Sequence, residues 1–156
     1  MNANGNSVAY ALLTITSRFN QVLRAAVEIL KGRISLYPPA VRRLEAEFAK
    51  MVGTEYGLMF TNATSGLEAA LFSLGVKKNT KVGTVGYVIP SSYCSATALG
   101  AELTFIDIDE QTLNINVDQL VSKSGDDIDV LIVVHFYGNP CNMKRIMKWA
   151  EANGVW

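Results

Sequence analysis

The hydrophobic positions of the chain change their spacing near residue 55. Before that point, apolar residues recur at the three- and four-residue intervals of amphipathic helices, which are predicted over residues 17–31 and 41–52. After it, short apolar runs alternate with segments of helical spacing. The runs predict strands at 56–60, 82–89, 103–108 and 130–134. The segments between and after them predict helices at 65–74, 92–99, 117–121 and 143–152.

Strands that alternate with helices favour a parallel sheet with right-handed crossovers. We therefore predict an α/β fold with three layers, α/β/α, and a mostly parallel sheet. Residues 130–134 are five consecutive aliphatic residues, a run that suits a strand buried on both faces. Gly53 and Gly154 stand where helices are expected to end, and a further strand is expected to begin at 154–156. Consecutive prolines predict a loop over 35–39.

Composition and charge narrow the class of protein. The 156 residues are 49% hydrophobic and 18% charged, which indicates a folded globular chain. We expect an N-terminal tail at 1–16 and one domain, itself only part of a larger one, at 17–156. Fourteen basic residues balance fourteen acidic ones, which argues against nucleic acid as a partner.

Membrane, secretion and metal sites are also disfavoured. The early apolar run at 8–15 is too short to span a bilayer, and no basic segment precedes it as in a signal peptide. Cys94 and Cys141 form neither a disulfide framework nor a metal-binding spacing and suit a reducing cytosol. We therefore expect a cytoplasmic protein.

The segment from Thr61 to Gly66 has the residue types of a phosphate-binding turn before a helix. Helices begin with unpaired N–H groups and a positive dipole end, so a phosphate fits there without a lysine. Ser65 and Glu68 equally fit an ordinary capping box, which any helix can have. Neither Gly-x-Gly-x-x-Gly after a strand nor a Walker lysine is present, so the dinucleotide and P-loop alternatives are weak.

His135, the only histidine, follows the aliphatic run at the predicted carboxyl end of a strand, where α/β proteins place their sites. A hydrogen-bonded structural role is nevertheless expected more often than catalysis at such a position. Asp107 and Asp109 also lie at a strand end. One histidine and no further carboxylate cluster argue against a metal pair, and turn or cap roles are expected instead.

Four stretches, in order, resemble the N-terminal part of the DegT/StrS-type, pyridoxal-phosphate-dependent sugar aminotransferases of aspartate-aminotransferase fold. They are Arg43–Ala49 with Gly53, Thr61–Leu71, Phe105–Asp109 with Thr112–Ile115, and His135–Pro140 with Met143 and Ala150–Gly154. The resemblance implies a phosphate-binding turn at Ala63, Thr64 and Ser65. The family usually has glycine where this chain has Ala63, which would be unfavourable if that position needed a positive φ.

The aromatic residue expected to stack on the cofactor ring has two possible alignments. Matching Pro90 to the family's proline places the stacking position at Cys94, beside Tyr93. Aligning without gaps places it at Ile89, near Tyr87. Tyr87 and Tyr93 are therefore both candidates, and each could equally fill the core.

The resemblance further implies a parent enzyme that transfers an amino group, from glutamate, to a nucleotide-linked keto-sugar in polysaccharide or amino-sugar biosynthesis. Alternatives are a sugar dehydratase of the same fold and a non-catalytic binding or regulatory domain. The family's Schiff-base lysine is expected beyond Trp156, so this chain has no predicted catalytic residue and is expected to be inactive alone. A homodimer is implied, with 17–31 and 35–39 facing the partner.

Overall fold

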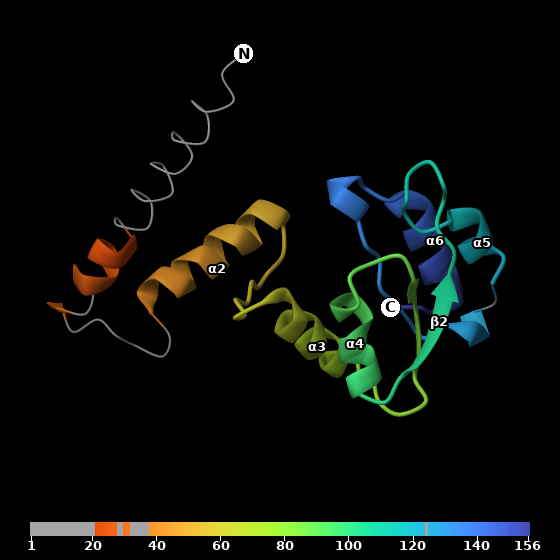
Figure 1. The fold of residues 1–156 in the computed structure, drawn as a ribbon, viewed down its shortest axis with the longest axis horizontal. Helices are drawn as coiled ribbons and strands as arrows, with labels where there is room; N and C mark the ends of the chain where they lie inside the picture. Colours follow the sequence, from red (N-terminus) through yellow and green to blue (C-terminus); the bar gives the residue numbers. More distant parts are fainter. Residues whose placement is uncertain (1–20, 28–29, 32–37, 124) are drawn as a thin grey trace, which may run out of the picture. The chain divides into compact units, whose positions relative to one another are not determined.

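The computed structural model describes residues 21–27, 30–31, 38–123 and 125–156, and the chain divides into two compact units. The first unit ends at Met59 and the second runs from Phe60 to Trp156. Figure 1 draws both units, coloured along the sequence from red at the N-terminus to blue at the C-terminus.

Two helical segments make up the described part of the first unit. Residues 21–27 are helical and fall inside the predicted helix 17–31. Residues 17–20 and 28–29 of that prediction lie outside the described residues. Helix α2 spans Pro39–Val52 and ends at Gly53, whose φ of 76° is left-handed. Pro39 was predicted to belong to a loop, but it opens α2 because a proline at the first helical position loses no hydrogen bond. Pro38 is the extended N-cap of α2, and residues 35–37 of that predicted loop lie outside the described residues.

The segment 56–60 is not a strand, contrary to the prediction. A strand needs a neighbouring strand that pairs with its backbone N–H and C=O groups. None of the described strands pairs with this segment. The Met59 N–H instead donates to the Glu45 carboxylate at 2.9 Å. Gly57 lies so close to α2 that a Cβ there would stand 2.6 Å from the Glu45 carbonyl oxygen. Hydrogen bonding to α2 therefore replaces sheet pairing.

The second unit alternates helices and parallel strands. Its elements are α3 (Ala63–Ser73), β1 (Lys81–Val85), α4 (Ser91–Ala98), β2 (Glu102–Ile106), α5 (Val117–Val121), η1 (Gly125–Asp127), β3 (Val130–Leu131), η2 (Phe136–Gly138) and α6 (Met143–Asn153). The strand order is β2-β1-β3, and both pairings are parallel. The predicted α/β class and parallel sheet are therefore confirmed.

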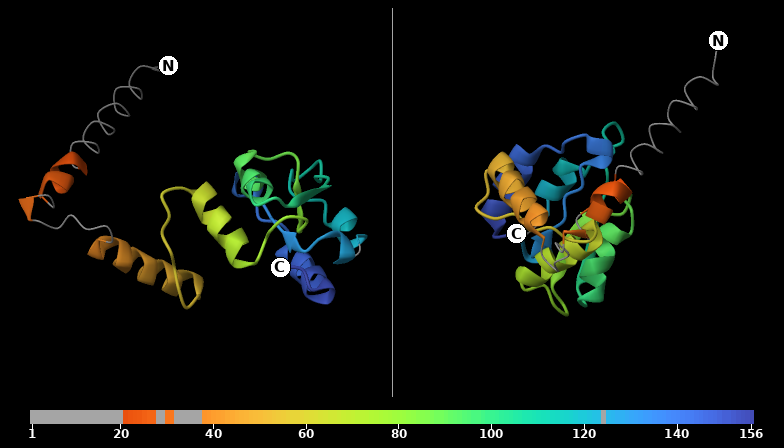
Figure 2. Two further views of the ribbon diagram at one scale, coloured as in Figure 1. Left: turned by 90° about the horizontal axis from the view of Figure 1, so that it is seen from below. Right: turned by 90° about the vertical axis from the view of Figure 1, so that its left-hand side faces the viewer.

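Helices cover both faces of this sheet, so the unit has three layers (Figure 2). One core lies on the α3 and α4 side and includes Leu71, Ala96, Val82, Val130 and Ile132. The other lies on the α5 and α6 side and includes Leu120, Ile146, Trp149, Val85 and Ile106. Because successive strand residues point to opposite faces, β1 and the run from Val130 contribute to both cores, as the aliphatic run predicted.

The strands are shorter than the sequence suggested. β1 ends at Val85, because the chain bends over residues 86–88. β3 keeps only two residues, although the Ile132 N–H still donates to the Gly83 carbonyl at 2.8 Å. On the other side of β3, the backbone N–H of Trp156 donates to the Asp129 carbonyl, and the Trp156 carbonyl accepts from the Leu131 N–H. This alternation is a parallel ladder, so the predicted further strand begins to pair at Trp156.

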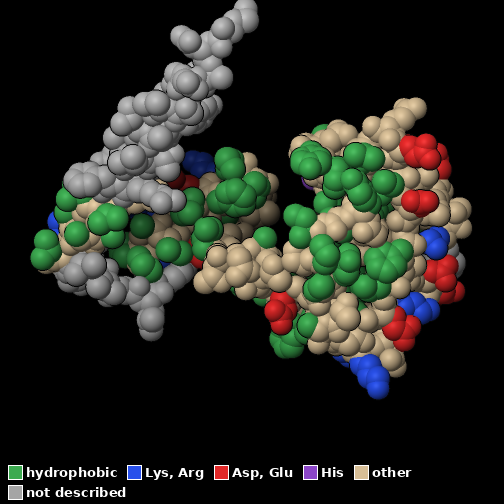
Figure 3. Space-filling model, in the orientation of Figure 1, with side chains coloured by type: hydrophobic (Ala, Val, Ile, Leu, Met, Phe, Trp, Pro, Cys, Tyr) green, Lys and Arg blue, Asp and Glu red, His purple; other side chains and the backbone are tan. Residues whose placement is uncertain are grey.

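The surface of the second unit is mixed in character. On the face drawn in Figure 3, hydrophobic side chains gather in patches and charged side chains lie toward the margin. Large apolar residues that are exposed in this unit include Phe72, Ile89, Phe105, Tyr137 and Trp156.

Replacing Gly83 with valine tests the packing on β1. A Cβ at this position would stand 2.9 Å from Ile128 Cδ1 and 3.0 Å from Leu131 Cδ1. We expect this overpacking to lower the free energy of unfolding by about 1–3 kcal/mol, as measured by urea denaturation. Gly86→Val is the matched control, because the nearest atom to a Cβ there lies 3.8 Å away. Equal losses in the two variants would contradict this account of the packing.

Candidate functional site

The carboxyl edge of the sheet gathers the residues that the sequence singled out. In a parallel α/β unit each connecting helix runs opposite to the strands, so α3 and α4 begin at the edge where the strands end. Open α/β sheets bind ligands outside this edge. Ala63–Ser65, Tyr87 and His135 all belong to segments that begin or end there.

The start of α3 carries two unoccupied backbone donors. Asn62 is the N-cap, and its side-chain oxygen accepts from the Ser65 N–H at 2.8 Å. For the N–H groups of Ala63 and Thr64, the described residues supply no acceptor. Both residues are exposed, while Ser65 is half-buried. The first turn of α3 can therefore bind an anion through two backbone N–H groups and the Thr64 hydroxyl.

The geometry of this turn bears on the predicted capping box and on the fit of alanine at position 63. The capping box predicted for Ser65 and Glu68 does not form, because Asn62 is the cap and Ser65 is the third residue of α3. Ala63 is not among the described residues with positive φ. It is an ordinary first helical residue, so alanine fits here without the strain that a positive φ would impose.

A hydrogen bond ties α3 to α4 at this edge. The Ser95 hydroxyl, 3% exposed, donates to the Thr64 carbonyl at 3.4 Å. The bond fixes the first turn of α3 against the neighbouring helix.

A cleft of about 490 Å³ opens at the same edge, beyond the ends of β1 and β3. Its lining includes Tyr87, Ile89, Ser92, His135, Phe136 and Tyr137. Three of these rings form a cluster: the Tyr87 and Phe136 centroids lie 5.2 Å apart and those of Phe136 and Tyr137 lie 4.7 Å apart. The first two rings are inclined at 37° and the last two are nearly perpendicular, at 82°, so the cleft offers aromatic faces and edges rather than one plane.

The two tyrosine candidates differ in their surroundings. Tyr87 lines this cleft and is exposed. Tyr93 lies within α4, half-buried, and packs edge-on against Phe105 of β2 with centroids 5.7 Å apart. The structure therefore brings Tyr87, and not Tyr93, together with His135.

His135 is hydrogen-bonded through one ring nitrogen. Its Nδ1 accepts from the Cys141 N–H at 3.2 Å. Cys141 is buried, and its thiol donates to the Val134 carbonyl at 3.2 Å. Burial raises the pKa of the Cys141 thiol above its ordinary value. The thiol is therefore protonated and has a structural role. The hydrogen bond from the Cys141 N–H to the imidazole spans the turn of residues 135–141.

Three further residues of this edge were not singled out from the sequence. Asn114 is buried and hydrogen-bonds the loop after β3, and Phe136 and Tyr137 complete the aromatic cluster. Tyr137 also has a φ of 49°, rare for a bulky residue. The only available signal was that all three fall inside the motifs resembling the family.

Asp107 and Asp109 have the turn roles that the sequence predicted. The Asp109 carboxylate accepts from the Thr112 N–H and hydroxyl and from the Gln111 N–H. These bonds, chiefly from the Thr112 backbone, hold the pKa of Asp109 below its usual value. Asp107 accepts from the Ile108 N–H. In the part of the chain that is described, no cluster of residues suited to a metal ion occurs.

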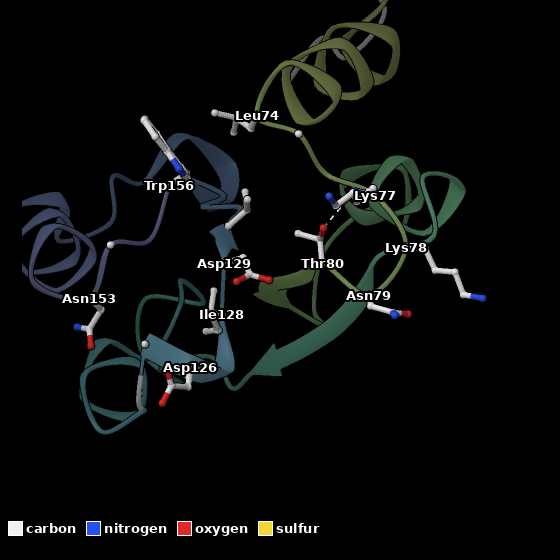
Figure 4. A pocket seen from close by; sticks show the side chains of 14 residues that line it. Leu74, Lys77, Lys78, Asn79, Thr80, Asp126, Ile128, Asp129, Asn153 and Trp156 are labelled. Carbon is white, nitrogen blue, oxygen red and sulfur yellow. Dashed lines mark hydrogen bonds between the residues drawn. The ribbon is translucent and has the colours of Figure 1, made fainter.

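A cleft of about 930 Å³, larger than the one beside Tyr87, lies at the opposite edge of the sheet (Figure 4). Its lining comes from the turns before β1 and β3 and from the end of α6. Two of its polar groups bond Lys81 of β1: the Asp126 carbonyl accepts from the Lys81 ammonium, and the Asp129 carboxylate accepts from the Lys81 N–H. Lys78 points away from the cleft. The Asp126 carbonyl and the Asp129 carboxylate are thus engaged in joining the turns.

None of the helices within the described residues is both long and apolar enough to cross a membrane.

Comparison with known proteins gives the lineage of this arrangement. Residues 16–156 match the DegT/DnrJ/EryC1/StrS aminotransferase family, and the chain belongs to that family.

Three relatives illustrate the match. An uncharacterized protein from Methanocaldococcus jannaschii is 27% identical over 83% of this chain and 33% of its own length. The structure of an aminotransferase from Psychrobacter cryohalolentis is 26% identical, with a TM-score of 0.78 over 84% of this chain and 33% of that one. The structure of E. coli GDP-4-keto-6-deoxy-D-mannose-3-dehydratase with bound hydrated PLP shares the fold. It is 23% identical, with a TM-score of 0.77 over 85% of this chain and 36% of that one. The chain spans about a third of the length of these relatives.

Proposed function

We propose that the protein takes part in pyridoxal 5′-phosphate-dependent transfer of an amino group, with the carboxyl edge of its sheet as the cofactor site. The observation that carries this proposal is the pair of exposed N–H groups at Ala63 and Thr64, at the start of α3, in a chain of an aminotransferase family. When bound, the cofactor would supply an electron sink for the carbon that bears the amine.

The residues of this chain would bind and orient the cofactor. The N–H groups of Ala63 and Thr64 would hold its phosphate at the positive end of α3, and the hydroxyls of Thr64 and Ser65 would add donors. The bond from Ser95 to the Thr64 carbonyl keeps this turn in place. Tyr87 would offer an aromatic face to the ring. Tyr93 is the second candidate, and its packing against Phe105 makes it the less accessible one.

The substrates of the whole protein follow from the same proposal. We take the amino acceptor to be a nucleotide-linked keto-sugar and the amino donor to be glutamate, in cell-surface polysaccharide or amino-sugar biosynthesis in the cytoplasm. The E. coli dehydratase shares this fold, so a sugar dehydratase is the alternative within the same chemistry.

A non-catalytic binding or regulatory role is the alternative of another class, and the distribution of lysines favours it for this chain alone. All eight lysines lie among the described residues, and none lines the cleft of Tyr87 and His135. Lys77, Lys78 and Lys81 lie at the opposite edge of the sheet. The chain therefore has the parts to bind the cofactor's phosphate and ring, and no lysine placed to bind its aldehyde.

Borohydride reduction after mixing the purified chain with pyridoxal 5′-phosphate tests this assignment. We expect scattered, substoichiometric labelling of exposed lysines when the adducts are mapped by mass spectrometry, and no turnover of an amino donor. One stoichiometrically labelled lysine together with turnover would show that the chain is a complete catalyst and would refute its proposed inactivity.

An Ala63→Pro substitution tests the cradle itself. Proline at the first helical position removes one N–H and is compatible with the helix, and Asn62 before it is already extended. We expect binding of pyridoxal 5′-phosphate, followed by titration of the amide signals, to weaken about tenfold through loss of one charge-assisted hydrogen bond. Stability should change by less than about 0.5 kcal/mol.

Val117→Pro, at the first position of α5, is the control for the substitution. It should leave this affinity unchanged. If Ala63→Pro bound the cofactor as tightly as the unsubstituted chain, the phosphate would not lie at the start of α3.

The proposal includes a homodimer. Apolar residues of the first unit support it, because Val22, Leu23 and Leu30 are exposed in the described parts of the predicted dimer-facing segment 17–31. Residues 35–37 of the other predicted segment lie outside the described residues. Multi-angle light scattering at micromolar concentration should give twice the mass of one chain, and replacing Leu23 and Leu30 with serine should shift that mass toward the monomer. A monomeric unsubstituted chain would contradict this part of the proposal.

A further inference from the structure

The loop between β3 and α6, residues 135–140, carries half of the aromatic cleft. His135, Phe136 and Tyr137 all line the cleft. The loop turns through left-handed conformations, with φ of 49° at Tyr137 and 79° at Gly138. A tyrosine in that region is strained, and its side chain, 96% exposed, is not buried to compensate. Contacts elsewhere in the loop must therefore hold its backbone.

Asn114 supplies those contacts from the segment that follows β2. Its side-chain oxygen accepts from the Phe136 N–H at 2.9 Å, and its side-chain nitrogen donates to the Asn139 carbonyl at 3.0 Å. Asn114 is 5% exposed. Its own carbonyl accepts from the Asp109 N–H at 2.8 Å, which anchors the segment. A buried carboxamide with both ends paired specifies one arrangement, because neither partner can find water instead.

The loop so held determines which nitrogen of His135 can donate. Nδ1 accepts from the Cys141 N–H, so a neutral His135 must carry its proton on Nε2. Among the described residues, none accepts a hydrogen bond from Nε2. The side chain is exposed and lines the cleft. The imidazole is thus a fixed-tautomer donor with its donor nitrogen unoccupied.

We propose that Asn114 is a positioning residue, which holds the 135–140 loop so that His135 offers an Nε2–H donor to an oxygen atom of the molecule bound in the cleft. The acceptor is a phenolate, carboxylate or carbonyl oxygen, beside the rings of Tyr87 and Phe136. The identity of that molecule rests on the proposed function, whereas the tautomer is a property of the chain alone.

Nitrogen-15 NMR of the full chain tests the proposal directly, because the chain has a single histidine. At about pH 8, where an ordinary imidazole is neutral, we expect the Nε2-protonated tautomer and a coupling across the hydrogen bond from the Cys141 amide to Nδ1. In Asn114→Ala the coupling should disappear, and hydrogen exchange of the Cys141 amide should accelerate roughly tenfold, as expected for the loss of one net hydrogen bond.

Two further variants separate positioning from general destabilisation. Asn116→Ala removes the N-cap of α5, whose side chain accepts from the Gln119 N–H at 3.0 Å. It should leave the His135 signals unchanged. Asn114→Asp keeps an acceptor for Phe136 and loses the donor to Asn139, so it should accelerate Cys141 exchange less than alanine does. It also serves if Asn114→Ala does not fold.

Two outcomes would overturn the positioning role. One is a wild-type imidazole without a preference for the Nε2–H tautomer. The other is a folded Asn114→Ala with wild-type His135 signals and Cys141 exchange. If neither Asn114 variant folds, the wild-type tautomer and coupling decide the question.

Titration with pyridoxal 5′-phosphate separates the donor role from the proposed function. We expect shifts of the Ala63 and Thr64 amides and of His135 Nε2. Shifts of the amides alone would overturn the donor role of His135 and leave the cofactor site in place. No shift at either place would overturn the proposed function together with the donor role, while the tautomer measurement would still test the positioning role of Asn114.

Discussion

The parallel pairing of β1 with both of its neighbours is the constraint on which the second unit depends. β1 lies between β2 and β3, and its Val82 and Thr84 are fully buried. Parallel neighbours cannot be joined by tight turns, so each connection must cross the sheet through a helix. The buried faces of the strand then need cover on both sides, which the α3–α4 and α5–α6 layers provide. The three-layer architecture follows from this one strand.

The same constraint creates the candidate site. Parallel strands end at a common edge, and their crossover helices begin there, so helix N-termini and strand-end loops meet. The first turn of α3 provides backbone donors, and the loops after β1 and β3 provide aromatic rings and an imidazole. The opposite edge has a larger cleft, in which the Asp126 carbonyl and the Asp129 carboxylate bond Lys81 and so join turns. Cleft size alone would therefore point to the edge opposite the candidate site.

Local sequence was a good guide wherever a local rule decides structure. Gly53 and Gly154 end helices in left-handed conformations, as the sequence predicted. α5 has the predicted bounds, and Asp109 makes the predicted turn. The segment 56–60 shows the limit of such rules. It has the composition of a strand, but a strand exists only with a partner, and Glu45 takes up the Met59 N–H instead. Asn62 rather than Ser65 caps α3, because both can cap and only the path of the chain chooses between them.

The sequence by itself determined the α/β class and the parallel sheet, and it indicated the candidate phosphate-binding turn, because periodicity and helix-start chemistry act over a few neighbouring residues. The tertiary structure decided which side chains share a site. Tyr87 and Tyr93 are equivalent by type and spacing, yet only the bend after Val85 brings Tyr87 beside Phe136. Asn114 and Asn139 are 25 residues apart, and only the packing of the loop after β3 against the segment after β2 joins them. Such pairings depend on where distant segments meet, which no local pattern encodes.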